Sequence, residues 1–189
     1  MKTPIIVAVT AGALASGALI HAQTKSADKA FVAGGKVTIQ LDGGEYIVRA
    51  AADNHGRVTL IGNTGNATAD VTVAGSQANV SVKNTPHSNF KAVIEVPKTA
   101  DLVVRLSGGD LGVEGIIGNK DIEATAGDLK IEAGSPNDYA SVDASVRVGD
   151  LSAGPFGEAK GFLSKSVAWT GAGKYRLHAK LGAGDLKLK

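Results

Sequence analysis

The chain contains no cysteine, so no disulfide bond can stabilise it and no thiolate is present to act as a nucleophile. Aromatic residues make up only 4% of its 189 residues, with a single tryptophan among them. A core with so few rings must be built from Val, Ile, Leu and Ala, which suits thin, regularly stacked layers. Beyond residue 22, no stretch of ten residues has an amphipathic helical pattern, and no apolar stretch approaches the length of a membrane span. These absences favour an all-β protein.

The N-terminus has the one long apolar run of the chain. Lys2 supplies a positive charge, residues 5–20 contain no charge, and Ala22 is a small residue suited to cleavage. The pattern predicts a secretory signal peptide over residues 1–22 rather than a membrane anchor, because the run is short for a span. The absence of cysteine excludes a lipoprotein anchor. We therefore expect a periplasmic or extracellular protein with no transmembrane segment after signal cleavage.

The remaining residues are expected to form one domain preceded by a leader. Residues 23–35 are polar and small, which predicts a flexible leader. Residues 36–41 (KVTIQL) alternate between apolar and polar side chains, as a half-buried strand does. A turn at 42–44 and a second alternating run follow, and short strands separated by turns continue to the C-terminus. Residues 36–189 are therefore expected to be a single all-β domain.

A Gly-Asp-Leu triplet recurs four times in the second half of the chain and opens a short alternating run each time. Glycine permits a turn conformation closed to other residues, and aspartate can accept hydrogen bonds from nearby amides. One turn-plus-strand unit used repeatedly predicts a β-solenoid or β-helix-like stack, with a β-sandwich as the alternative. The expected structural turn residues are Gly109, Asp110, Gly127, Asp128, Gly149, Asp150, Gly184 and Asp185.

The triplet aspartates have two alternative roles. As calcium ligands they would have to place several oxygens around one point, and the nonapeptide calcium pattern is not present. As carboxylates of a polysaccharide enzyme, at least two of Asp110, Asp128, Asp150 and Glu132 would have to meet in one cleft. The histidines beyond the signal peptide have no metal-ligand spacing. We therefore expect no catalytic, cofactor-binding or metal-binding residues, and no cofactor.

Charge is unevenly distributed, although the formal net charge is only +2. Residues 101–143 hold nine acidic and three basic residues, whereas residues 160–189 hold seven basic residues and one acidic residue. Such a surface could meet an anionic envelope polysaccharide or another envelope protein, and solvated strand faces are the simpler explanation. Nucleic acid is not an expected partner, because the basic stretch has few aromatic residues for stacking and an exported protein rarely meets nucleic acid.

Four residues near the C-terminus are candidates for surface binding. Trp169 precedes a Gly-Ala-Gly sequence, so its indole could lie exposed as on a sugar-binding surface, or could close the end of a thin core. In the run 175–181 the alternation places Arg176 and Lys180 on the outer face. The candidates are Trp169, Tyr175, Arg176 and Lys180.

The same region carries a resemblance to a known family. Residues 169–177 (WTGAGKYRL) followed by 184–188 (GDLKL) resemble the closing pattern of the bacterial putative adhesin domains of unknown function, and the Gly-Asp-Leu units upstream look like the body of that family. The resemblance covers roughly residues 36–189. It implies a right-handed or similar β-helical stack in exported, envelope-associated proteins, with no catalytic residues to carry over.

These observations together predict a function outside enzyme chemistry. We expect a non-enzymatic, exported cell-envelope module that serves in surface interaction, adhesion or envelope maintenance. The alternative is a carbohydrate-active β-helix enzyme or a polysaccharide-binding protein.

Overall fold

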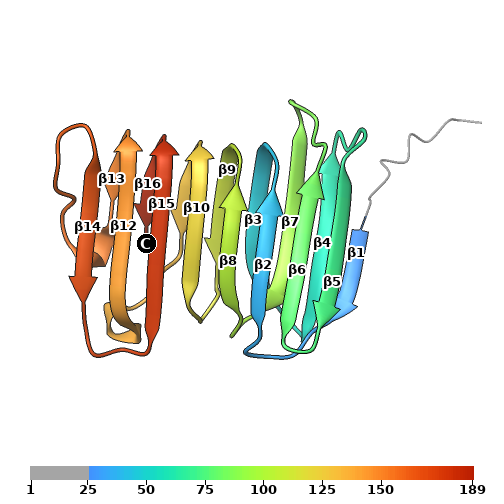
Figure 1. Ribbon diagram of the computed structural model, residues 1–189, viewed down its shortest axis with the longest axis horizontal. Helices are drawn as coiled ribbons and strands as arrows, with labels where there is room; N and C mark the ends of the chain where they lie inside the picture. Colours follow the sequence, from blue (N-terminus) through green and yellow to red (C-terminus); the bar gives the residue numbers. More distant parts are fainter. Residues whose placement is uncertain (1–25) are drawn as a thin grey trace, which may run out of the picture.

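The computed structural model describes residues 26–189, which form two β-sheets of eight strands each (Figure 1). The predicted signal peptide, residues 1–22, lies outside the described residues. The strands are accompanied by two short 3₁₀ helices, η1 (Pro136–Asp138) and η2 (Gly154–Phe156). Within residues 26–189, no helix has the length and apolar character needed to cross a membrane. The expected all-β fold is confirmed.

The two sheets are generated by strand–turn–strand units, each of which places its first strand in one sheet and its second strand in the other. Neighbouring units pair in parallel, and antiparallel strands are added at both ends. In spatial order, sheet B consists of β14 (Lys165–Thr170), β12 (Tyr139–Val148), β15 (Tyr175–Ala183), β10 (Lys120–Ala126), β8 (Asp101–Leu106), β2 (Lys36–Leu41), β6 (Gln77–Lys83) and β5 (Thr68–Ala74). In the same direction, sheet A consists of β13 (Leu151–Ser152), β16 (Leu186–Leu188), β11 (Leu129–Ile131), β9 (Gly109–Glu114), β3 (Gly44–Ala51), β7 (Phe90–Pro97), β4 (His55–Gly62) and β1 (Ser26–Ala30).

The spatial order of the units differs from their order along the chain. The first unit, β2/β3, lies between β6/β7 and β8/β9, and the last unit, β15/β16, lies between β10/β11 and β12/β13. A simple solenoid would stack its units in chain order. The solenoid prediction is therefore not confirmed, and the observed layout is that of two facing mixed sheets, which is closer to the predicted alternative of a β-sandwich.

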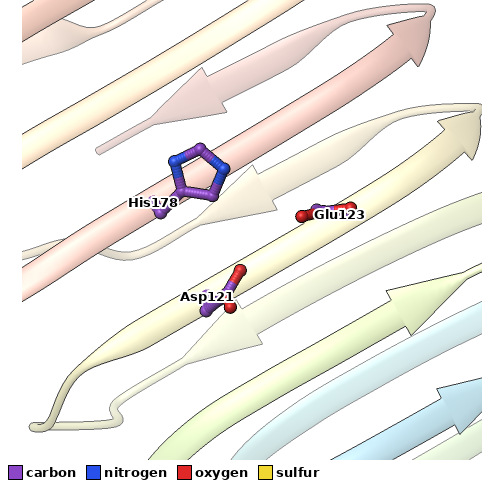
Figure 2. Close-up of side chains that lie close together, drawn as sticks. All are labelled: Asp121, Glu123 and His178. Carbon is purple, nitrogen blue, oxygen red and sulfur yellow. The ribbon is translucent and has the colours of Figure 1, made fainter.

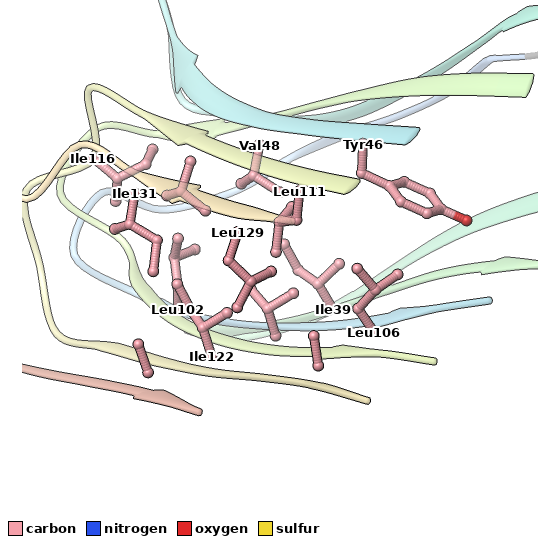
Figure 3. Close-up of a cluster of buried hydrophobic side chains, with 14 of the residues drawn as sticks. Ile39, Tyr46, Val48, Leu102, Leu106, Leu111, Ile116, Ile122, Leu129 and Ile131 are labelled. Atoms are coloured by element: carbon pink, nitrogen blue, oxygen red, sulfur yellow. The ribbon is translucent and has the colours of Figure 1, made fainter. Parts of the chain in front are cut away.

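The core lies between the two sheets and is aliphatic, as the composition predicts (Figure 3). Parallel pairing aligns equivalent positions, so Leu111, Leu129 and Leu186 form one buried row in sheet A. Val104 and Ile122 form part of a matching buried row in sheet B. Strand residues that alternate with these point outward, so each sheet has one face in the core and one face in solvent. The outer faces are the surfaces available for function.

An aromatic cluster lies at the β12/β14 end of the stack. Tyr139 and Phe156 pack edge to face with their ring centroids 5.7 Å apart, and Phe156 packs in the same way on Trp169 at 5.6 Å. Tyr139 and Phe156 are buried, and Trp169 is half-buried. Trp169 thus packs against the end of the aliphatic core and keeps part of its surface in solvent.

The structure differs from the expected flexible leader at residues 26–31. Strand β1 pairs antiparallel with β4, and Arg57 Nε donates to Asp28 Oδ2 across this pair at 3.0 Å. Phe31 is buried, and its ring lies so close to Gly35 that a Cβ atom there would be 2.4 Å from it. No residue of β1 itself is buried, because β1 is an edge strand, and the sequence therefore lacks the apolar alternation that would have indicated a strand.

Candidate functional site

The glycines of the four predicted turn triplets lie next to one another at the starts of neighbouring strands of sheet A. They form a line across the sheet that is here termed the glycine column. The column begins at Gly44 and continues through Gly109, Gly127, Gly184 and Gly149, all with positive φ. A Cβ atom added at Gly109, Gly127, Gly184 or Gly149 would lie 1.9–2.0 Å from the carbonyl oxygen of the preceding glycine. Only glycine therefore allows the units to stack at this distance.

The aspartates of the triplets form a parallel row and link one unit to the next. Asp128 N–H donates to the carboxylate of Asp110 at 3.2 Å. Asp185 N–H donates to Asp128 at 3.3 Å, and Asp150 N–H donates to Asp185 at 3.3 Å. Because the carboxylates lie along a line, they do not surround a single point as the ligands of a calcium ion do. Their hydrogen bonds connect the turn of one unit to the turn of its neighbour.

A shallow depression of about 250 Å³ on the outer face of sheet A brings together three of the carboxylates that an enzyme would require, Asp110, Asp128 and Glu132. Backbone amides engage them: Asp110 accepts from the next unit, and Glu132 Oε2 accepts from Gly115 N–H at 3.2 Å. Asp150, the fourth candidate, lies at the far end of the row in an ion pair with Lys165. Asp110, Asp128 and Glu132 thus already accept hydrogen bonds from backbone amides.

The outer face of sheet B carries a denser arrangement of charge. Arg105 on β8 lies at its centre, with its Nη2 atom 3.0 Å from Asp121 Oδ2 and 3.5 Å from Glu123 Oε1 on β10. On the other side of β10, His178 of β15 pairs in register with Asp121 and lies 3.8 Å from Asp143 of β12, measured from Nδ1 to Oδ1. Basic and acidic side chains thus alternate across four strands of this face.

Asp121, Glu123 and His178 are the described residues that could hold a metal ion (Figure 2). One potential ligand atom from each lies within 4.8 Å of the others, and imidazole with two carboxylates suits a divalent transition metal. Arg105 binds the same two carboxylates and supplies the positive charge that a metal would otherwise provide. Sequence reasoning missed this cluster because β10 and β15 are far apart in the chain and become neighbours only through parallel pairing.

A depression of about 520 Å³ lies beside this cluster, toward the C-terminal ends of β8, β10 and β15, and is here termed the basic depression. Its lining includes four cationic side chains from four strands and two acidic side chains. The cations are Lys83, Arg105, Arg147 and Lys180, and the acids are Asp42 and Glu123. Within residues 26–189, no ion pair joins Lys83, Arg147 or Lys180 to a carboxylate.

The lining of the basic depression also contains small residues, Ser107, Thr125 and Gly182. A Cβ atom at Gly182 would lie 2.3 Å from the carbonyl oxygen of Thr125, so this position accepts no side chain. Because Gly182 of β15 has no side chain, the surface between Arg147 of β12 and the end of β10 is left unfilled. The result is a hollow bordered by cations, which can accommodate a carboxylate, sulfate or phosphate group.

The four predicted surface-binding residues are not brought together. Lys180 lines the basic depression, and Arg176 lines a second depression of about 640 Å³ near the start of β10 and β15. Tyr175 is half-buried, with Lys174 Nζ 5.4 Å from the centroid of its ring. Trp169 belongs to the aromatic cluster at the end of the stack. Lys83 and Arg147 were not predicted, because only the strand order places them around the same depression as Lys180.

Comparison with protein-family models gave no match, and comparison with curated protein sequences also gave none. Solved structures do resemble this chain. A putative adhesin from Bacteroides fragilis NCTC 9343 aligns over 89% of this chain and 98% of its own, with 11% identity and a TM-score of 0.28. A putative adhesin from Parabacteroides distasonis ATCC 8503 aligns over 88% of this chain and 70% of its own, with 12% identity and a TM-score of 0.27.

The structural similarity is greater for a putative cell adhesion protein from Clostridium sporogenes ATCC 15579. The alignment covers 88% of this chain and 100% of that chain, with 15% sequence identity and a TM-score of 0.53. This identity is too low to transfer a function, and the TM-score exceeds the level at which two folds correspond. The chain therefore shares the fold of the Clostridium protein.

Proposed function

We propose that this protein is a non-enzymatic module of the cell envelope that binds an anionic polymer through the outer face of sheet B. The observation that carries the proposal is the basic depression. Lys83, Arg147 and Lys180 line it without a carboxylate partner among residues 26–189. Arg105, which belongs to the neighbouring charge cluster, is the fourth cation of the lining. Cations of this kind around a hollow attract anions and retain them by charge-assisted hydrogen bonds.

The geometry favours a polymer over a small ligand. The outer face of sheet B extends over eight strands and holds a second depression near the opposite ends of β10 and β15, whose lining includes Lys36, Lys174 and Arg176 together with Asp101, Asp121 and Asp143. A chain with regularly spaced carboxylate, sulfate or phosphate groups could contact both, and each weak contact would add to the affinity of the next. Polysaccharides and other anionic polymers of the bacterial envelope have this chemistry.

The shared fold and the N-terminal sequence agree with this location. The Clostridium protein is named for cell adhesion, which is a surface interaction. The signal-like pattern of residues 1–22 supports export to the periplasm or the exterior. We further propose that the units represent a solenoid-like repeat, rearranged in order, because the Gly-Asp-Leu turns of successive units stack in register.

Binding to defined polymers tests the function. We expect the protein to bind polygalacturonate and dextran sulfate immobilised on a surface, and to bind neutral dextran much more weakly. The double variant Lys83→Gln/Lys180→Gln should bind the anionic polymers about tenfold more weakly, because two charge-assisted contacts of roughly 0.7 kcal/mol each are lost. The difference should shrink at high salt, where screening weakens both proteins.

The matched control is Lys130→Gln/Lys187→Gln, which removes two exposed lysines from the outer face of sheet A. It changes the net charge by the same amount and should retain most of the affinity. Equal losses in the two variants would mean that overall charge governs binding, and the basic depression would then not be the site.

A carbohydrate-active enzyme remains the second candidate, because Asp110, Asp128 and Glu132 do line one depression. It would require turnover of a polysaccharide, with loss of turnover in Asp128→Asn. Release of reducing ends from a panel of neutral and acidic polysaccharides distinguishes the two functions, since a binding module leaves every polymer intact.

A further inference from the structure

A loop at one end of the stack exposes two adjacent apolar side chains. It connects η2 to β14 and is visible beyond β14 in Figure 1. Phe162 is 93% exposed and Leu163 is 73% exposed, more than any other large apolar residue within 26–189. The other phenylalanines, Phe31, Phe90 and Phe156, are at most 6% exposed. Phe162 is therefore exposed, whereas the other phenylalanines in this part of the chain are buried in the core.

The loop is held in a defined conformation. Lys160 N–H donates to the carbonyl oxygen of Ser166 at 2.9 Å, and Ser166 N–H donates to that of Lys160 at 2.9 Å. Between them, Gly161 has φ +116°, and a Cβ atom there would lie 1.9 Å from the carbonyl oxygen of Ser164. A tight turn with a closed base thus presents Phe162 and Leu163 at its tip, which we call the apolar tip.

Basic residues lie in the turn below the apolar tip and on the adjacent strand. Lys160 and Lys165 lie at the base of the turn, and Arg147 is exposed on the adjacent strand β12. The acidic groups nearby are Glu158 in the loop and Asp150, which pairs with Lys165. The balance is positive, so the surroundings of the tip favour an anionic partner.

We propose that the apolar tip inserts into the interface of an anionic lipid bilayer, with the neighbouring lysines at the level of the headgroups. A stable protein interface buries about 800 Å² on each partner, whereas two side chains on a narrow convex turn offer far less. A bilayer needs no complementary pocket. Insertion of apolar side chains and attraction of the flanking basic residues to anionic lipid headgroups both favour binding to it. Arg147 borders both this surface and the basic depression, whereas Lys83 and Lys180 line only the depression, so variants of those two lysines can separate the two activities.

The absence of cysteine from the chain permits a local test. A single cysteine introduced as Leu163→Cys can carry a polarity-sensitive nitrobenzoxadiazole fluorophore on the full chain. We expect its emission to rise and shift to the blue with vesicles of phosphatidylcholine and phosphatidylglycerol, and to stay unchanged with phosphatidylcholine alone. Adding Phe162→Ser to the labelled chain should weaken the vesicle response about tenfold, because the larger apolar side chain of the tip is removed.

The control label is placed at Ile61→Cys, a residue 44% exposed on β4 near the opposite end of the stack. Its emission should not change with either vesicle. Three results would overturn the proposal: no response at Leu163→Cys, equal responses at both labelled positions, or a response without lipid that increases with protein concentration. The last result would assign the tip to contact with a second copy of the chain. Lys83→Gln/Lys180→Gln should leave the response at Leu163→Cys intact, which separates lipid insertion from polymer binding.

Discussion

Replacing Gly127 by alanine is expected to destabilise the protein by about 4 kcal/mol or more, enough to leave much of the chain unfolded. Gly127 has φ +119°, and the new Cβ atom would lie 1.9 Å from the carbonyl oxygen of Gly109. The three nearest atoms are all backbone atoms of Gly109, so no side chain can move to relieve the clash. The units would have to separate, and with them the row of aspartate hydrogen bonds would be broken.

The control for this substitution is Gly157→Ala. Gly157 has a similar φ of +111°, but a Cβ atom there would meet nothing within 4 Å. It should therefore cost only the backbone strain, about 2 kcal/mol. The free energies of unfolding of the three proteins, measured in urea, check the prediction. Equal losses in the two variants would show that conformation alone, without close stacking, selects glycine in the column.

Lys120→Met is expected to stabilise the protein at neutral pH by up to roughly 3 kcal/mol. Lys120 is 2% exposed, and its Nζ lies 2.9 Å from Tyr139 Oη and 3.3 Å from the carbonyl oxygen of Gly118. Burial lowers the pKa of Lys120 from 10.5 to about 8, which outweighs the opposing effect of Asp138 and Asp101. Methionine has a similar shape without the charge, and Tyr139 keeps its own hydrogen bond to Ala133.

The pH dependence identifies the cause. Below pH 8 the amine is protonated in both states, and the folded protein bears the full cost of burying the charge. Between pH 8 and 10.5 the unfolded chain binds more protons at this group, so the stability of the wild type should rise with pH. Unfolding in urea from pH 7 to 9.5 avoids most of the titration of unfolded tyrosine.

Lys120→Met should lack this rise, whereas Lys36→Met, which removes an exposed lysine from β2, should retain it. A wild-type stability that stays constant from pH 7 to 9.5 would contradict the assignment. Loss of stability in Lys120→Met at pH 7 would mean that the hydrogen bonds of the amine outweigh its desolvation.

Local patterns predicted much of this fold, because in a strand with one buried face the alternation of apolar and polar residues shows which side chains point into the core. The alternation in residues 36–41 predicted a half-buried strand, and its apolar residues Val37, Ile39 and Leu41 are all buried. Lys120 carries a similar signal, since it shares the inward positions of β10 with Ile122 and Ala124. When a lysine occupies one of the alternating positions that are otherwise apolar, the sequence pattern alone predicts that its amine is buried.

The order of the units could not be read in the same way. Each unit has nearly the same turn and the same alternation, so the sequence of one unit does not specify which other unit lies beside it. The basic depression depends on that order: Lys83 and Lys180 line the same depression because β2, β8 and β10 lie between their strands. The apolar tip had no periodic signal either, because Phe162 and Leu163 lie in an irregular loop.

The position of the last unit has a consequence for the continuity of both sheets. Residues 175–189 occupy a slot between layers made earlier, and they join the segment 139–170 to the rest of the molecule. Without this segment, each sheet would have a gap where a paired strand should be, and the two gaps would face each other. Residues 175–189 connect the two parts of each sheet, so both sheets become continuous only when this segment is in place.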